Sequence, residues 1–197
     1  RDQKPVFLDE ADYTHCLGQI RALSQQYELA IHAFCLLPDG LHILATPLGD
    51  PGNLSRFMKA LSCSASSRRK RLHGATSVWE VRYRSSPVEP GQWMLACICY
   101  IERLPVTQRL ASSAYHYHRS SYRMRLGKTH QYWLEDPEEY TRLGGSIEDR
   151  AEAYRMYMSN GLDPHEEKMI DTAVKRCRLT GSRHFVREVY RKYGVLG

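Results

Sequence analysis

The chain has 197 residues, of which 42% are hydrophobic and 25% are charged, and its formal net charge is +6. This composition is typical of a globular protein and excludes a fully disordered or fibrous chain. The longest apolar run, residues 93–101, has nine residues and is too short to cross a membrane. We therefore expect no membrane partner, and the lack of a secretory leader pattern at the start favours a cytoplasmic protein.

The first half of the chain predicts alternating helices and strands. Asp9 is a suitable N-cap for a helix over residues 10–27, where apolar residues recur at helical spacing. Residues 29–37 are almost entirely apolar and predict a buried strand. Pro38-Asp39-Gly40 predicts a turn into a second strand over residues 41–46.

A helix, a strand and a helix are predicted next. Asp50-Pro51 predicts the start of a helix that ends at Gly74. Residues 77–84 alternate between apolar and charged side chains, as in a strand with one charged face. A helix over residues 93–104 is expected to stop at Pro105. With a strand expected before Arg1, this order predicts an α+β fold with a ferredoxin-like βαββαβ layer.

The last third of the chain predicts helices only. Ser146-x-x-Asp149, Asp163-Pro164 and Gly181-Ser182 each resemble the start of a helix. We therefore predict two domains, an α+β domain over residues 1–130 and a helical C-terminal subdomain over residues 131–197.

The positive charge is concentrated in two blocks. Residues 56–84 hold eight basic residues against Glu80 alone, and residues 103–128 hold six basic residues and no acid. The remaining residues sum to −7. Basic blocks in an otherwise acidic chain favour contact with nucleic-acid phosphates over a merely solvated basic face.

Aromatic and cysteine residues add two further expectations. Tyr115, Tyr117 and Tyr122 lie within or beside basic residues and are candidates for stacking on unpaired bases, whereas Trp79 and Tyr83 are assigned to the core. The six cysteines contain no CxxC pair and are expected to be free thiols rather than disulfides or zinc ligands.

Four segments carry a family resemblance. Residues 30–47 read AIHAFCLLPDGLHILATP, residues 79–86 read WEVRYRSS, residues 100–106 read YIERLPV and residues 120–123 read SSYR. In this order they resemble motifs of the REP-associated tyrosine transposases, in which the first segment is the strand with a His-hydrophobic-His (HUH) pair. The resemblance covers nearly the whole chain.

The resemblance implies a fold and a chemistry. Members of this family act on hairpins and single-stranded DNA in the bacterial cytoplasm, at the nucleoid, and this class often forms homodimers. The two histidines share one face of a strand and hold Mg²⁺ or Mn²⁺. A tyrosine on a following helix then attacks the scissile phosphate and forms a 5′-phosphotyrosine link.

This chain departs from the family at the metal site and at the nucleophile. Gly40 stands where the first histidine belongs, so His42 is left as a vestigial ligand. The nucleophile position falls at Ser64 or Ala65, and the metal-binding position one helical turn later falls at Arg68 or Arg69. We therefore expect an inactive homologue with no metal cofactor and no catalytic residue.

The expected function is recognition of hairpin or single-stranded DNA, with RNA as a further possibility, by a protein that can form a homodimer. Two alternatives remain open: an active transposase with substitute residues such as Ser64, for which the sequence identifies no base, and a protein–protein interaction module. Of residues 68–71, which point in successive directions on one helix, we expect two to bind. The residues expected to contact nucleic acid are Arg56, Lys59, Arg68, Arg69, Lys70, Arg71, Arg82, Arg84, Arg119, Arg123 and Arg125.

Overall fold

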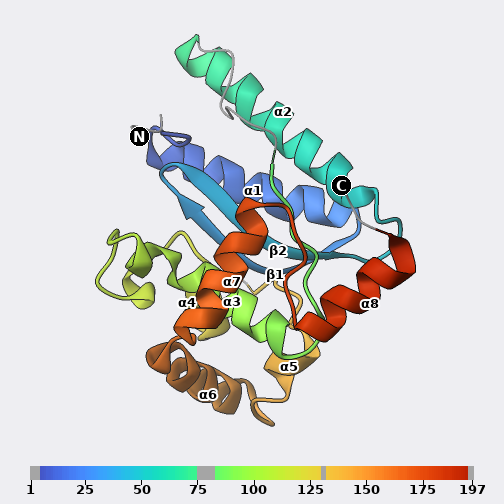
Figure 1. The fold of residues 1–197 in the computed structure, drawn as a ribbon. Coiled ribbons are helices and arrows are strands. Elements are labelled where there is room, and N and C mark those ends of the chain that lie inside the picture. Colours follow the sequence, from blue (N-terminus) through green and yellow to red (C-terminus); the bar gives the residue numbers. More distant parts are fainter. Residues whose placement is uncertain (1–4, 75–82, 130–131, 195–197) are drawn as a thin grey trace. The chain divides into compact units, whose positions relative to one another are not determined.

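The computed structural model describes residues 5–74, 83–129 and 132–194. Within them are eight α-helices, one short 3-10 helix and one two-stranded antiparallel sheet (Figure 1). The fold is α+β, as predicted. Four strands of a ferredoxin-like layer are not present among the described residues. Most of the predicted strand over residues 77–84 lies outside them, including Trp79 and Arg82, and Arg84 is not in a strand.

The chain forms two compact units. Unit 1 comprises Arg1–Tyr83 and Ile101–Glu135, and unit 2 comprises Arg84–Tyr100 and Asp136–Gly197. Each unit is therefore built from two separate stretches of the chain. The predicted domain boundary at residue 130 stays a prediction.

The centre of unit 1 is a hairpin of β1 (Leu29–Leu37) and β2 (Gly40–Pro47), drawn as blue arrows in Figure 1. Leu37 pairs with Gly40, so the loop is Pro38-Asp39 and the predicted turn is confirmed. All nine residues of β1 are buried. The register shifts by one residue between Ile31 and Ala33, as in a β-bulge.

Two helices of unit 1 cover one face of this hairpin. α1 (Glu10–Gln26) begins as predicted, because the Asp9 carboxylate accepts a hydrogen bond from the Asp12 backbone N–H at 2.8 Å. α2 (Asn53–His73) ends at Gly74, whose φ of 67° is the left-handed conformation of a helix C-terminus. Its predicted cap is wrong: the Asp50 carboxylate accepts from the Gly52 N–H at 2.8 Å, in the turn before the helix.

The second edge of β1 is also hydrogen-bonded. The Leu36 N–H donates to the Arg119 carbonyl at 2.9 Å, and the Glu135 N–H donates to the Ile31 carbonyl at 2.9 Å. Between these two contacts lies α4 (Tyr122–Arg125), and η1 (Ala114–His116) precedes both. β1 is thus paired on both sides, and its backbone is not left as an open sheet edge.

α3 (Gln92–Thr107) is longer than predicted. It continues through Pro105 for two more residues, so the predicted end at residue 104 is wrong. A proline lacks the N–H that would bond to the carbonyl four residues earlier, so α3 continues past Pro105 without this one bond and ends after two more residues. The N–H groups of Leu110 and Ala111 then donate to the Pro105 carbonyl at 2.7 and 3.2 Å.

Unit 2 contains α5 (Glu138–Thr141), α6 (Ile147–Asn160), α7 (Pro164–Lys175) and α8 (Arg183–Tyr193). The three predicted helix starts are confirmed, since the side chains of Ser146, Asp163 and Ser182 each accept a hydrogen bond from the first turn that follows. The buried rings of Tyr140 and Tyr154 pack edge to face, with centroids 5.5 Å apart. None of the helices in the described ranges is long and apolar enough to cross a membrane.

Candidate nucleic-acid interface

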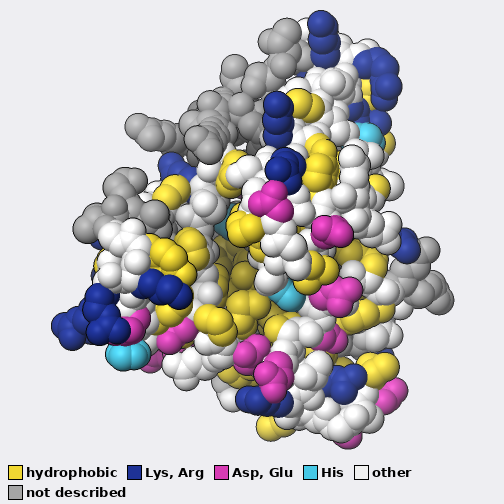
Figure 2. Space-filling view, turned by 90° about the vertical axis from the view of Figure 1, so that its right-hand side faces the viewer, with side chains coloured by type: hydrophobic (Ala, Val, Ile, Leu, Met, Phe, Trp, Pro, Cys, Tyr) yellow, Lys and Arg dark blue, Asp and Glu magenta, His cyan; other side chains and the backbone are white. Residues whose placement is uncertain are grey.

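α2 has one buried face and one basic face. Phe57 and Leu61 are buried in the core of unit 1, and Arg68 follows them on the same side of the helix. The opposite side is exposed to solvent, and on the face shown in Figure 2 the Lys and Arg side chains gather along the upper part of the molecule, where Figure 1 places α2. The exposed basic residues of this face, which we call the α2 stripe, are Arg56, Lys59, Lys70 and Arg71.

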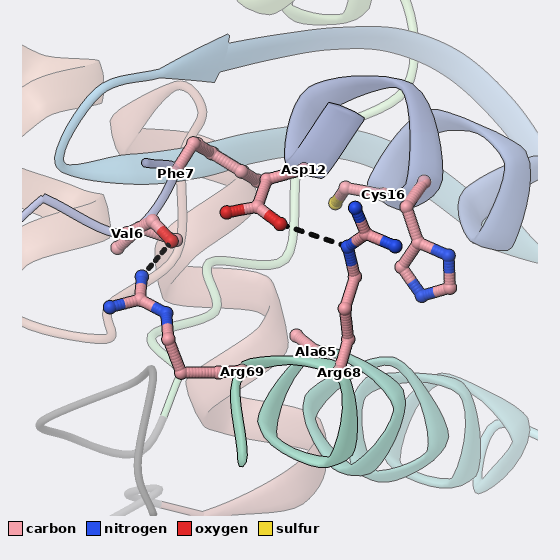
Figure 3. Close-up of a pocket in the computed structure, with 8 residues that line it drawn as sticks. Val6, Phe7, Asp12, Cys16, Ala65, Arg68 and Arg69 are labelled. Atoms are coloured by element: carbon pink, nitrogen blue, oxygen red, sulfur yellow. Dashed lines mark hydrogen bonds and ion pairs between the residues drawn. The ribbon is translucent and has the colours of Figure 1, made fainter. Parts of the chain in front are cut away.

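Arg68 and Arg69 point away from this stripe and toward the N-terminal segment (Figure 3). The Arg68 Nε donates to Asp12 Oδ1 at 2.8 Å, and these side chains are only 18% and 10% exposed. The Arg69 guanidinium donates to the carbonyls of Pro5 and Val6 at 3.1 and 2.5 Å. These two arginines therefore hold α2 against α1 and the segment before it.

Beside them lies a cavity of about 20 Å³, lined by Asp12, His15 and Cys16 among others. It has room for about one water molecule and is too small for a nucleotide. Burial opposes ionisation of Asp12, but the hydrogen bonds from Arg68 and the Leu8 N–H and the charges of Arg68 and Arg69 outweigh it. The pKa of the Asp12 carboxyl is therefore lowered.

The second basic block, residues 103–128, also contains both partly exposed and buried arginines. Arg119 forms an ion pair with Glu10, and its guanidinium lies 3.7 Å from the centroid of the Tyr13 ring. Arg123 lies 5.1 Å from the centroid of the Tyr115 ring and is hydrogen-bonded to His118. Both arginines remain partly exposed. These contacts hold both side chains in place.

The prediction for Arg125 is wrong. Its side chain is fully buried, its Nε donates to Glu102 Oε1 at 3.3 Å, and its guanidinium also donates to the His32 carbonyl. A guanidinium enclosed in this way cannot reach a phosphate in solvent. Arg125 is a core residue that neutralises the buried carboxylate of Glu102.

Fewer aromatic residues are available for stacking on bases than the sequence predicts. Tyr117 is buried, and its hydroxyl donates to the Leu36 carbonyl at 2.6 Å, while Tyr122 is 5% exposed. Neither ring is available for stacking on a base. Tyr115 is 40% exposed and remains available. Tyr83 is half-buried, with its hydroxyl 3.0 Å from Ser55 Oγ at the start of α2.

His42 and Gly40 share one face of β2, as the HUH pattern requires. Leu41 and Ile43 point the other way and pack on the core that contains Phe57 of α2. A side chain at Gly40 would meet no atom within 4 Å of its Cβ. His42 thus offers one imidazole and Gly40 offers none. Among the described residues no cluster of three or more His, Cys, Asp or Glu side chains that could hold a metal ion is present.

Ser64, at the position of the family's nucleophile, has a neighbour that the sequence did not identify. Its Oγ lies 3.1 Å from His15 Nε2 of α1. Burial, followed by the positive charges of Arg68 and Arg71, lowers the pKa of the His15 imidazole. A base is therefore present beside Ser64. This contact joins residues 49 positions apart, and no local pattern predicts it.

Three segments of the resemblance meet in one buried network. Ser121 Oγ lies 2.5 Å from Glu102 Oε1 and accepts a hydrogen bond from the Phe34 N–H at 3.1 Å. Phe34 belongs to the strand motif, Glu102 to YIERLPV and Ser121 to SSYR. Glu102 and Ser121 are both 0% exposed. The motifs therefore act together as parts of one core.

A second, larger hollow of about 530 Å³ lies in unit 1, and Trp133, Arg21 and Glu28 are among the residues that line it. The Trp133 ring is stacked on Phe34, with centroids 5.4 Å apart and planes 4° apart. An indole fixed in this way, beside polar side chains, is suited to a flat ligand such as a nucleobase. No motif in the sequence marks Trp133 as a functional residue.

All six cysteines are free, as predicted. Cys16, Cys35, Cys97 and Cys99 are buried, whereas Cys63 and Cys177 are exposed. Comparison of the chain with protein-family models, with curated proteins and with solved structures finds no match.

Proposed function

We propose that this chain is a DNA-binding relative of the REP-associated tyrosine transposases, which holds hairpin or single-stranded DNA without cutting it. The α2 stripe carries this proposal. Its four basic side chains are exposed on one side of a helix whose other side is anchored in the core. A row of cations on an anchored helix suits a phosphate backbone, because the helix itself needs no ordering when the ligand binds.

The loss of cutting follows from what replaces the family's reactive groups. Gly40 leaves His42 without a second imidazole, and α2 contains no tyrosine. Arg68, near the expected metal ligand, is instead paired with Asp12. A cation at this position repels a divalent metal ion instead of binding it.

The resemblance to this family also implies a more specific fold, the ferredoxin-like βαββαβ layer. A ferredoxin-like layer needs two strands in addition to β1 and β2, and these two are not among the described residues. The buried network of Phe34, Glu102 and Ser121 supports this assignment, since residues from three motifs of the resemblance contact one another there.

The test measures binding and cleavage on the same substrates. Fluorescence anisotropy with a labelled hairpin that has a single-stranded foot, a single strand and a duplex should show tightest binding to the hairpin. Affinity should fall steeply between 50 and 200 mM salt, with a slope of roughly −3 for about four phosphate contacts. A denaturing gel with Mg²⁺ or Mn²⁺ should show no covalent adduct. Affinity that does not change with salt would overturn the proposal.

A second candidate function is supported by the contact between Ser64 Oγ and His15 Nε2. In this alternative, the His15 imidazole accepts the hydroxyl proton and Ser64 attacks a phosphodiester, so that a 3′-hydroxyl leaves and a phosphoserine ester to DNA remains. A denaturant-stable adduct that is lost in Ser64→Ala would establish it in place of the inactive form.

A further inference from the structure

The C-terminal part of the chain contains two regions of opposite charge. Residues 129–174 hold eleven acidic residues against four basic ones, whereas residues 175–197 hold seven basic residues against Glu188 alone. The net charge of residues 129–197 is therefore close to zero, although residues 175–197 form a third basic block. Four of the seven basic residues of this block lie in α8 (Arg183–Tyr193).

α8 presents three of these arginines on one side. Arg183, Arg187 and Arg191 are four residues apart and all are exposed, so they form a row, which we call the α8 row. At a rise of 1.5 Å per residue, the row is about 12 Å long. Nucleotides of one strand follow one another about every 3.4 Å along a duplex axis. The α8 row therefore spans about three and a half nucleotide steps along such a strand.

Most of the positive charge of the α8 row is not neutralised by acidic side chains of the described residues. Arg183 and Arg187 have no hydrogen-bond or ion-pair partner among the residues whose structure is described. Arg191 pairs with Glu188 at 2.8 Å, but its side chain is 78% exposed. Exposed pairs of this kind contribute little and exchange readily for a stronger anion.

The helix that carries the row is fixed at its start. The Ser182 N–H donates to Glu89 Oε2 at 2.5 Å, and its hydroxyl donates to Oε1 at 3.1 Å. Just before it, Thr180 is hydrogen-bonded to the backbone of Pro87 and Glu89. The row is therefore presented by an anchored element of unit 2.

Arg84, which is also expected to contact nucleic acid, precedes the segment that pairs with the residues leading into α8. It is exposed and lies two residues before Ser86, whose hydroxyl donates to the Arg178 carbonyl at 2.5 Å. Arg178 is also exposed. These segments run side by side in unit 2, because Val88 and Thr180 form a parallel bridge.

We propose that the α8 row, with Arg84 and Arg178, is a second site for the phosphate backbone of nucleic acid. This inference rests on the proposed nucleic-acid binding and extends it to unit 2. Guanidinium groups bind phosphate oxygens through two parallel hydrogen bonds, and the row contains arginines only. A lipid surface fits less well, because Phe185 and Val189 of α8 are half-buried in the protein rather than free to enter a bilayer.

The test uses the full chain and two charge-matched variants. The first, Arg183→Gln/Arg187→Gln/Arg191→Gln, removes the α8 row. The control, Arg142→Gln/Arg155→Gln/Lys168→Gln, removes the same charge from exposed positions in the acidic part of unit 2. Circular dichroism checks that both fold, and anisotropy measures binding to the labelled single strand and hairpin between 50 and 200 mM salt.

We expect the α8 variant to bind at least tenfold more weakly at 100 mM salt, with a salt slope smaller by about two, and the control to change less than threefold. Equal losses in both variants, or none in the α8 variant, would overturn this inference while the proposed function stands. Failure of the unaltered chain to bind any oligonucleotide would overturn both. Retained DNA binding, with loss of binding to phosphatidylserine vesicles in the α8 variant, would assign the row to lipid instead.

Discussion

The Arg125 Nε donates to Glu102 Oε1 at 3.3 Å, and both side chains are completely buried. An arginine from a sequence block that looks like a basic surface is thus the counter-ion of a core carboxylate. The pair is surrounded by further polar partners: Ser121 contacts Glu102, and the His32 carbonyl accepts from Arg125. Each of these groups depends on the others to remain buried.

Removal of one partner should therefore be strongly destabilising. We expect Arg125→Met to lower the free energy of unfolding by about 3–5 kcal/mol, because Glu102 is left as an unpaired buried charge. Urea denaturation followed by circular dichroism measures this change. Arg142→Met is the control, since Arg142 is 72% exposed and should change stability by less than about 0.5 kcal/mol. A loss below about 1 kcal/mol for Arg125→Met would contradict the buried pair.

The ion pair between Asp12 and Arg68 should make stability depend on pH. The pKa of Asp12 is lowered in the folded protein, so its contribution is present above the unfolded pKa of about 3.9 and is lost as pH falls through the folded value. Asp12→Asn should be less stable than the wild type at pH 7, by about 1–3 kcal/mol. The difference should shrink as pH falls below 4. Thermal unfolding at a series of pH values tests this, and a constant difference down to pH 2 would contradict it.

The two sides of α2 should respond differently to neutralisation. Lys59→Gln/Lys70→Gln/Arg71→Gln should weaken DNA binding at least tenfold and reduce the salt slope by roughly two, with little change in stability. Arg68→Gln should instead lower the stability, because it leaves Asp12 without its partner. Anisotropy and urea denaturation of both variants measure the contrast. If Arg68→Gln weakens binding as much as the triple variant and leaves stability unchanged, the assignment of the two sides is reversed.

Restoring the missing histidine should restore a metal-binding pair. Gly40→His places a second imidazole two residues from His42 on the same face of β2, in open space. We expect Ni²⁺ or Zn²⁺ to stabilise this variant, by about 2.7 kcal/mol at a concentration one hundred times its Kd. Thermal unfolding with and without the ion measures the effect. Gly40→His/His42→Ala is the control and should lose the response; an equal response in both variants would show that the ion binds elsewhere.

Two of the six thiols should react in the folded protein. Burial raises the pKa of the Cys16 and Cys97 thiols to about 12, and also raises that of Cys35. Thiolate is the reactive form, so these groups should be inert, whereas Cys63 and Cys177 are exposed. Titration with a thiol reagent should modify two cysteines in buffer and six in denaturant. Peptide mapping should locate the first two at Cys63 and Cys177.

The local elements could be predicted because their signals are local. Asp9, Ser146 and Ser182 are caps with hydrogen bonds to residues three positions away, and the left-handed glycine at the end of α2 follows from its position. The predicted end of α3 was wrong at Pro105. The sequence shows where a helix loses a donor, but it does not show that α3 continues for two more residues before it ends.

Contacts between distant residues could not be predicted in this way. Arg125 looks like its neighbours in a basic block until Glu102, 23 positions away, is found beside it. The base beside Ser64 is 49 positions away. The basic segment over residues 175–197 is not visible in the net charge of the last third of the chain, because the acidic residues before it offset its positive charge.

The bridge between Val88 and Thr180 has a consequence for the order in which the protein folds. The Thr180 N–H donates to the Pro87 carbonyl at 2.9 Å, and the Glu89 N–H donates to the Thr180 carbonyl at 2.8 Å. These partners are more than ninety positions apart, and closing so long a loop carries a large entropy cost. During synthesis, residues 84–89 must wait until Thr180, more than ninety positions later, has left the ribosome before they can pair. A protein shortened before Thr180 would never form this bridge, even if the hairpin of β1 and β2, which is synthesised earlier, folds.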